Sequence, residues 1–293
     1  MMRAAASLEG DGAQLFYHQK GPLEILLPMA TWSLSGAINE WQCRLPFAFA
    51  AILGVAAIYL VGRRWLGTRA GAVGAGLLAI NGYFVGFGRI IQYQSLVLAM
   101  TALGLLALWR WHEDEGTRWL LAGSALLAFG FLGHYDAALA LPAAGFLVIR
   151  HLWDVPDRAG TFESPGREIG AAIAVGLGVL LPFYLPFVLH PNFGKTLSYL
   201  GGARLGADRL LYNNLVSSLP LATFYNTTYY LGALAVALIA AAVLPFRRWM
   251  LLVPAGCLLV ALLLPAIATG PLLALLLLAV ILAEDGPSRR AAW

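Results

Sequence analysis

Long apolar segments recur along most of this 293-residue chain, and they constrain its fold more than any other feature. Apolar residues make up 60% of the sequence and charged residues only 12%, whereas soluble domains have about 25% charged residues. A stretch of about 20 apolar residues can cross a bilayer as a helix. The pattern excludes an ordinary soluble domain and predicts an all-α, polytopic membrane protein.

The apolar segments predict about nine transmembrane helices. They cover residues 45–62, 70–87, 91–111, 118–133, 136–152, 168–190, 222–246, 249–268 and 270–283. We assign residues 45–293 to one membrane domain and residues 1–44 to an external loop with a helix lying in the interface. That helix is predicted over residues 22–36, because Pro22 and Gly36 bound it and it carries Trp32.

Arginines between the spans predict the orientation of the chain. Cytoplasmic loops of membrane proteins carry an excess of Lys and Arg. The arginines concentrate in alternate loops, at Arg63, Arg64, Arg69, Arg110, Arg118, Arg150, Arg158, Arg167, Arg247, Arg248, Arg289 and Arg290. Residues 1–44, 88–90, 134–136 and 191–221 then face the periplasm or the cell exterior. Because Met1–Gly10 contains no apolar core of a signal peptide, either the translation start is misassigned or a span is missing ahead of this chain; we expect the second, which would make the chain a fragment.

The residues suited to chemistry fall on the predicted external side. An ionisable group at bilayer depth costs roughly 2.5–3.5 kcal/mol and is usually retained for function. Lys20 lies in the run His18-Gln19-Lys20-Gly21-Pro22-Leu23, just before the predicted interfacial helix. A helix that starts at Gly-Pro can also hold phosphate through its free backbone N–H groups.

Three motifs together resemble the GT-C glycosyltransferases that use polyprenyl-phosphate sugars. They are His18-Gln19-Lys20-Gly21-Pro22-Leu23, Asn39-Glu40-Trp41-Gln42-Cys43-Arg44-Leu45-Pro46 and Gly62-Arg63-Arg64-Trp65-Leu66-Gly67. In that group, which includes protein O-mannosyltransferases and bacterial aminoarabinose transferases, a Lys-Pro-Pro-Leu-like motif, an interfacial helix, an Arg-Leu-Pro helix start and a Gly-Arg-Arg cytoplasmic turn follow in this order. The resemblance covers about residues 9–150.

The resemblance implies an inverting transfer of a hexosyl or pentosyl group from a polyprenyl-phosphate donor to an acceptor hydroxyl. It implies a catalytic residue with an acidic side chain in the first external loop, acting as the base. Asp11 is the candidate and Glu9 the alternate. A carboxylate can take the proton of the acceptor hydroxyl, and basic side chains can stabilise the departing phosphate. The candidate substrate-binding residues are His18, Lys20, Arg89, Gln94, His134, Asp136 and Arg204.

This chain departs from the pattern of the group in two regions, one before Lys20 and one after Arg89. Gln19 stands where the group can have an acidic metal ligand, and Gln92 and Gln94 follow Arg89 where an acidic residue is common. We therefore assign no cofactor and no metal ligand, and a divalent metal stays an open alternative. The partners expected are the lipid-linked donor, membrane lipid and a glycan, lipid or protein acceptor. Nucleic acid is not expected, because the net charge of +4 comes from the arginine loops.

Structural readings of the same residues stay open at this point. Asp11 could be a solvated loop acid, and Lys20 and Arg89 could anchor the chain to lipid headgroups. His134 and Asp136 could satisfy each other within a short turn. Two alternative functions remain. The protein could be a transporter or flippase for a lipid-linked precursor, or it could be a non-catalytic relative of the transferases. A transporter would show inverted repeats and buried charges at the midplane of the membrane.

The predicted orientation can be tested by cysteine labelling. A cysteine placed at Gly194 should react with a membrane-impermeant reagent added from outside, and one placed at Gly160 should not, because Gly160 lies in an arginine-rich loop. The reverse labelling pattern would contradict the prediction that the site faces outward.

Overall fold

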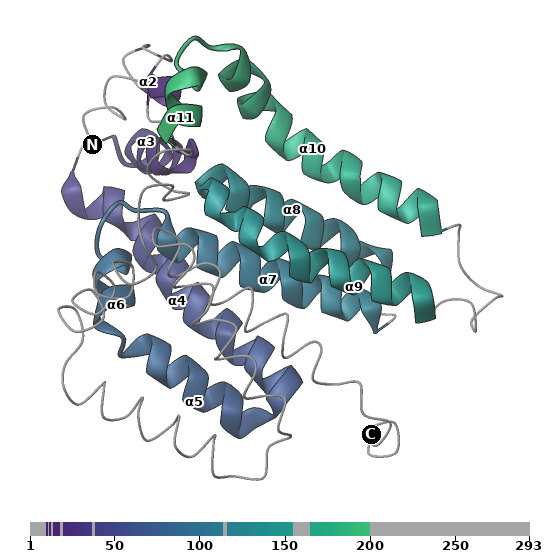
Figure 1. The fold of residues 1–293 in the computed structure, drawn as a ribbon. Helices are drawn as coiled ribbons and strands as arrows, with labels where there is room; N and C mark the ends of the chain where they lie inside the picture. The colour runs from purple at the N-terminus through teal and green to yellow at the C-terminus, as the bar shows by residue number, and fades with distance from the viewer. Residues whose placement is uncertain are drawn as a thin grey trace, which may run out of the picture.

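The computed structural model describes residues 10, 12, 14–17, 20–36, 39–113, 116–154 and 165–199. Every regular element in this part of the chain is a helix (Figure 1), which confirms the predicted all-α class there. The three predicted spans at 222–246, 249–268 and 270–283 lie outside the described residues, so the number of nine stays a prediction.

Short connections join the helices into one bundle. In chain order the elements are α2 (Gln14–Tyr17), α3 (Leu23–Ser35), α4 (Glu40–Leu66), α5 (Thr68–Ala79), α6 (Gly82–Gly88), α7 (Gln94–His112), α8 (Thr117–Gly133), the 3-10 helix η1 (Tyr135–Ala140), α9 (Leu141–Asp154), α10 (Pro165–Leu189) and α11 (Phe193–Tyr199).

Helix α7 is the centre of the bundle. It packs against α4, α8 and α9, and its Ala99, Ala102 and Leu105 are fully buried. Small residues let it approach α8 closely: a Cβ on Gly123 would lie 3.1 Å from the carbonyl oxygen of Gly104. Membrane helices commonly associate through such small residues, because van der Waals packing replaces the hydrophobic effect inside lipid.

Several helices are long and apolar enough to span a membrane. Among the described residues these are Glu40–Arg64, Gln94–His112, Tyr135–Trp153 and Gly166–Leu189. They coincide with four of the predicted spans. A fifth prediction, 118–133, falls on α8, which is apolar but shorter.

The predicted span at 70–87 is broken rather than continuous. Helices α5 and α6 meet there at an angle of 66°. The Oδ1 atom of Asn81 accepts a hydrogen bond of 2.8 Å from the backbone N–H of Phe84, and a side chain bonded in this way caps the start of a new helix. The Asn81-Gly82 pair in the sequence is therefore the cause of the break.

The predicted Gly-Arg-Arg motif, residues 62–67, contains the end of α4 and the turn that follows it. Arg63 and Arg64 lie in the last turn of α4, and the chain turns at Gly67, whose φ is 92°. Glycine adopts a positive φ without the steric cost that a Cβ would bring. The following helix then packs tightly, because a Cβ on Gly71 would lie 2.5 Å from the backbone nitrogen of Arg63.

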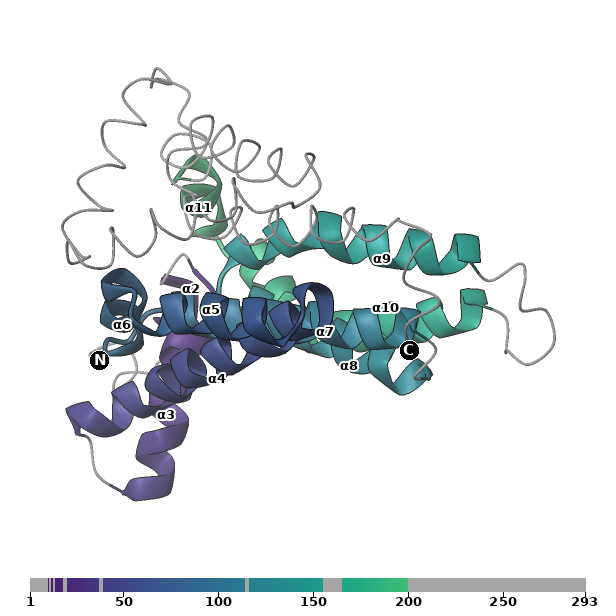
Figure 2. The same cartoon turned by 90° about the horizontal axis from the view of Figure 1, so that it is seen from below.

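Helix α3 matches the helix predicted over residues 22–36. It ends at Gly36, which has a φ of 68° and donates its N–H to the carbonyl oxygen of Trp32 at 2.9 Å. One face, with Ile25, Pro28 and Trp32, is buried. Helices α2, α3 and α11 gather at the end of the bundle where α7 begins (Figures 1 and 2).

The loop before α3 is pressed against the end of α8. A Cβ on Gly21 would lie 1.9 Å from the carbonyl oxygen of Leu132 and 2.5 Å from that of Gly133. The next residue, Pro22, is fully buried. Only glycine therefore fits at this position, and its fit holds Lys20 close to the residues that follow α8.

We expect Gly21→Ala to destabilise the protein by about 1–3 kcal/mol, because backbone atoms rather than a flexible side chain oppose the added methyl group. Thermal unfolding of the detergent-solubilised protein measures the effect. Gly145→Ala in α9 is the control, since a Cβ there meets no described atom within 4 Å. Equal unfolding temperatures for both variants would contradict the close packing at Gly21.

Candidate functional site

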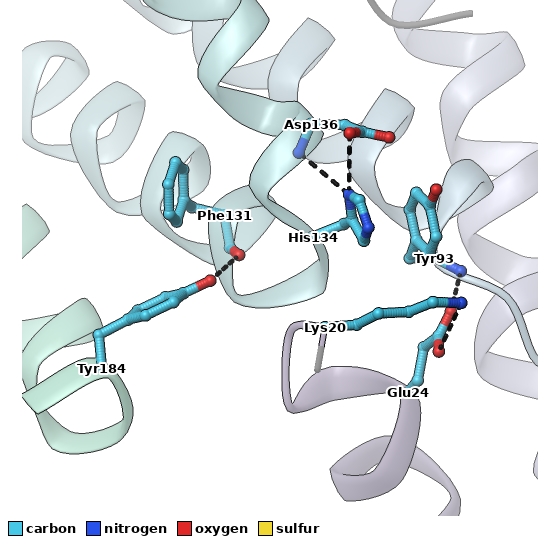
Figure 3. A network of polar contacts seen from close by, with 7 residues as sticks. All are labelled: Lys20, Glu24, Tyr93, Phe131, His134, Asp136 and Tyr184. Atoms are coloured by element: carbon cyan, nitrogen blue, oxygen red, sulfur yellow. Dashed lines mark hydrogen bonds and ion pairs between the residues drawn. The ribbon is translucent and has the colours of Figure 1, made fainter. Parts of the chain in front are cut away.

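Five polar or aromatic side chains from three separate segments meet at the end of the bundle where α7 begins. We call them the Lys20 cluster: Lys20, Glu24, Tyr93, His134 and Asp136 (Figure 3). Lys20 comes from the loop just before α3, Glu24 from the first turn of α3, Tyr93 from the N-cap of α7, and the other two from the junction of α8 and η1.

Glu24 joins α3 to α7. Its side chain is 5% exposed, and its Oε1 atom accepts a hydrogen bond of 2.8 Å from the backbone N–H of Tyr93. A buried carboxylate is costly unless it is hydrogen-bonded or paired with a cation. Hydrogen bonds to charged groups contribute about 1.5–3 kcal/mol, so this contact fixes the start of α3 on the bundle.

Lys20 lies close to the other oxygen of the same carboxylate. Its Nζ atom lies 3.9 Å from Oε2 of Glu24 and 5.2 Å from the centroid of the Tyr93 ring. A carboxylate and an aromatic face both attract an ammonium group. The Lys20 side chain is still 29% exposed, so this cation can meet a ligand from outside the bundle.

The Tyr93 ring is itself held in place by stacking. It lies parallel to the imidazole of His134, with ring centroids 3.7 Å apart and an interplanar angle of 7°. His134 is fully buried and also contacts the Tyr135 ring at a centroid distance of 3.8 Å. The stack connects the start of α7 to the end of α8.

His134 and Asp136 are in contact, as the sequence allowed. The Nδ1 atom of His134 lies 3.1 Å from the backbone nitrogen of Asp136 and 3.1 Å from its Oδ1 atom. Unprotonated Nδ1 accepts from the N–H, and protonated Nδ1 donates to the carboxylate. Either arrangement fixes the ring in the plane that stacks on Tyr93. The Asp136 side chain is 16% exposed.

Aromatic contacts tie α2 and α10 to this end of the bundle. The Tyr184 hydroxyl donates to the carbonyl oxygen of Phe131 at 2.8 Å (Figure 3). Phe16 of α2 stacks on Phe183 and Phe187 of α10, with centroids 5.9 and 6.3 Å apart. The segment that leads into Lys20 is therefore held against α10.

Two other predicted site residues flank the cluster without joining its contacts. Arg89 is exposed at the C-cap of α6, and it has no ion pair within the described part of the chain. Gln94 is the first residue of α7, next to Tyr93. Its buried Oε1 atom has no hydrogen-bond partner among the described residues, so an acceptor is left available next to the cluster.

The remaining predicted site residues cannot be placed. Asp11, Glu9, His18 and Arg204 lie outside the described residues. Within the described ranges, no three or more His, Cys, Asp or Glu side chains are grouped so that they could hold a metal ion.

Sequence reasoning left Glu24 and Tyr93 out of the predicted site. The opposite charges of Lys20 and Glu24, four residues apart in the sequence, were the available signal, although Lys20 lies in the loop before α3 and only Glu24 is on that helix. The role of Tyr93 left no local signal, since its backbone bonds to a carboxylate 69 positions earlier in the chain.

At the opposite end of the bundle, the acidic side chains bond to side chains of neighbouring helices. Arg64 at the end of α4 pairs with Glu113 after α7, and Glu113 also accepts from the Trp109 indole at 2.8 Å. Glu168 of α10 accepts from the Thr117 hydroxyl at 2.6 Å. These acids are bonded to bundle side chains, and the contacts join helix ends to one another.

Comparison with known proteins gives matches to sugar transferases. The family model of dolichyl-phosphate-mannose-protein mannosyltransferases matches residues 19–184. Protein O-mannosyltransferase 1 of Drosophila pseudoobscura pseudoobscura is 30% identical over 165 residues, which cover 51% of this chain and 18% of that protein. The Drosophila melanogaster protein of the same name is 28% identical with the same coverage. The chain thus spans about a fifth of the length of these relatives.

Solved structures with a similar fold include two of ArnT from Cupriavidus metallidurans. The structure bound to undecaprenyl phosphate has a TM-score of 0.58 at 19% identity, covering 96% of this chain and 53% of ArnT. The apo structure has a TM-score of 0.53 at 20% identity, covering 93% and 50%. At this identity the likeness shows the fold, and this chain spans about half of it.

Proposed function

Because this chain belongs to the dolichyl-phosphate-mannose-protein mannosyltransferase family, within the GT-C glycosyltransferases, we propose that it moves a hexosyl or pentosyl group from a polyprenyl-phosphate donor to an acceptor hydroxyl. The acceptor is a glycan, a lipid or a protein. The site lies in a multi-pass membrane protein and faces the periplasm or the cell exterior. The ArnT structure with undecaprenyl phosphate supports this class of donor.

The observation that carries the proposal is the placement of Lys20. Its ammonium is held beside Glu24 and the Tyr93 ring but remains partly exposed. When the sugar leaves, negative charge develops on the phosphate oxygen, and a cation fixed at that point stabilises it. Gly21 packs against the end of α8 and Pro22 is fully buried. The backbone of the loop is therefore fixed, and the Lys20 side chain extends from it within reach of a phosphate.

The transfer proceeds with inversion at the anomeric carbon. A carboxylate takes the proton of the acceptor hydroxyl, whose oxygen attacks the anomeric carbon from the side opposite the phosphate. The bond from carbon to phosphate oxygen breaks, and its electron pair stays on the phosphate. We assign the base to Asp11, with Glu9 as the alternate; both precede the α2 segment that leads to Lys20.

The other polar residues of this end are assigned to substrate binding. Gln94, with its buried acceptor atom, and the His134–Asp136 pair suit sugar hydroxyls. Arg89, His18 and Arg204 suit the phosphate. No step in this scheme is routed through a metal ion.

Lys20→Ala should lower sugar transfer from a polyprenyl-phosphate donor by about a hundredfold, because a stabilising cation is removed. Lys20→Arg should retain more activity, since the charge is kept although its geometry changes. The assay uses membranes and radiolabelled donor. Lys195→Ala, which removes an exposed lysine on α11, is the control. Equal transfer by parent and Lys20→Ala would leave Lys20 as a lipid anchor only.

Asp11→Asn should lower turnover by about a hundredfold to ten-thousandfold while donor binding is largely kept, because the amide has the shape of the carboxylate but not its basicity. Glu9→Gln, measured in parallel, identifies the alternate base. If both variants turn over at the parent rate, neither residue is the base.

A further inference from the structure

The two oxygens of the Glu24 carboxylate have different partners. Oε1 accepts from the backbone N–H of Tyr93 at 2.8 Å, whereas Oε2 lies 3.9 Å from Nζ of Lys20. The first distance is that of a charge-assisted hydrogen bond, and the second exceeds hydrogen-bond length. Glu24 is therefore fixed by the backbone of α7 and acts on Lys20 through charge alone.

We propose that Glu24 is the positioning residue for Lys20, holding its ammonium where it meets the donor phosphate; this rests on the proposed function. Nothing in the family motif places a functional carboxylate four residues after the lysine of this chain. Glu24 does not touch the donor in this scheme, because its side chain is 5% exposed.

The surroundings of Lys20 support this role. A lysine side chain is flexible, and its ammonium is a point charge that other groups must direct. Nζ lies 3.9 Å from the carboxylate of Glu24 and 5.2 Å from the centroid of the Tyr93 ring, over its face. That ring cannot turn freely, because it stacks on the buried His134 at 3.7 Å. The ammonium thus has a defined position while its N–H donors can still reach a phosphate oxygen.

Direct repulsion between the Glu24 carboxylate and the donor phosphate would have the opposite effect on donor binding. A carboxylate near a phosphate site repels the phosphate, so its removal should tighten donor binding if the lysine stayed in place. Positioning requires the reverse result, because a lysine that has lost its counter-charge spends less time at the phosphate. The sign of the change in affinity therefore separates the two accounts.

The test is a double-mutant cycle on the full chain with Glu24→Gln, Lys20→Ala and the double variant. Glutamine keeps a side-chain oxygen that can accept from the Tyr93 N–H, so the link between α3 and α7 is retained. Binding of undecaprenyl phosphate is measured together with KM and kcat for sugar transfer. Glu24→Gln should weaken binding about tenfold in the parent and less than about twofold when Lys20 is absent.

Glu40→Gln is the matched control, because Glu40 also pairs with a cation four residues away, Arg44, on an exposed helix end. It should leave binding unchanged. Tighter binding by Glu24→Gln, or an equal loss with and without Lys20, would overturn the positioning role.

A second measurement keeps this result separate from the proposed function. The rate at which an amine-reactive reagent modifies Lys20, followed by mass spectrometry, should rise several-fold in Glu24→Gln, because the Lys20 side chain is no longer held in one position and its amine becomes more accessible to the reagent. An unchanged rate overturns the positioning role whether or not the protein is a transferase. Failure of the parent protein to bind undecaprenyl phosphate would instead contradict the proposed function.

Discussion

The buried carboxylate of Glu24 is the contact on which the arrangement of the site depends. It lies between the start of α3 and the start of α7 and bonds to the backbone N–H of Tyr93. A carboxylate in this position must keep its partners, because an uncompensated buried charge is strongly destabilising. The contact therefore holds the first turn of α3 against α7, close to the Lys20 side chain.

Close packing supplies the second constraint. Gly21 lies against the carbonyl groups at the end of α8, and Gly104 and Gly123 bring α7 and α8 together. Inside a membrane these are van der Waals contacts, and their attraction weakens when the backbones move apart. As a result His134, which follows α8, reaches the Tyr93 ring. The side chains of the Lys20 cluster lie at helix ends whose positions the apolar packing fixes.

The sequence predicted the described helices well and their breaks less well. Hydrophobic spans are local, and each residue of α4, α7 and α10 contributes to the same signal. The bend at Asn81 was missed because a single capping hydrogen bond outweighs an apolar pattern that continues on both sides. The turn after α4 lies at Gly67, within the motif that predicted it, and the positive φ belongs to this glycine rather than to the arginines.

The sequence by itself determined a helical membrane protein and its family, and it singled out Lys20 as a candidate, because composition, apolar periodicity and short motifs are all local properties of the chain. Only the tertiary structure decided which side chains surround that lysine. Glu24 and Tyr93 are 69 positions apart, and His134 is further along still. Their meeting depends on how α3, α7 and α8 pack, and packing is set by the fit of distant surfaces rather than by any neighbouring residues.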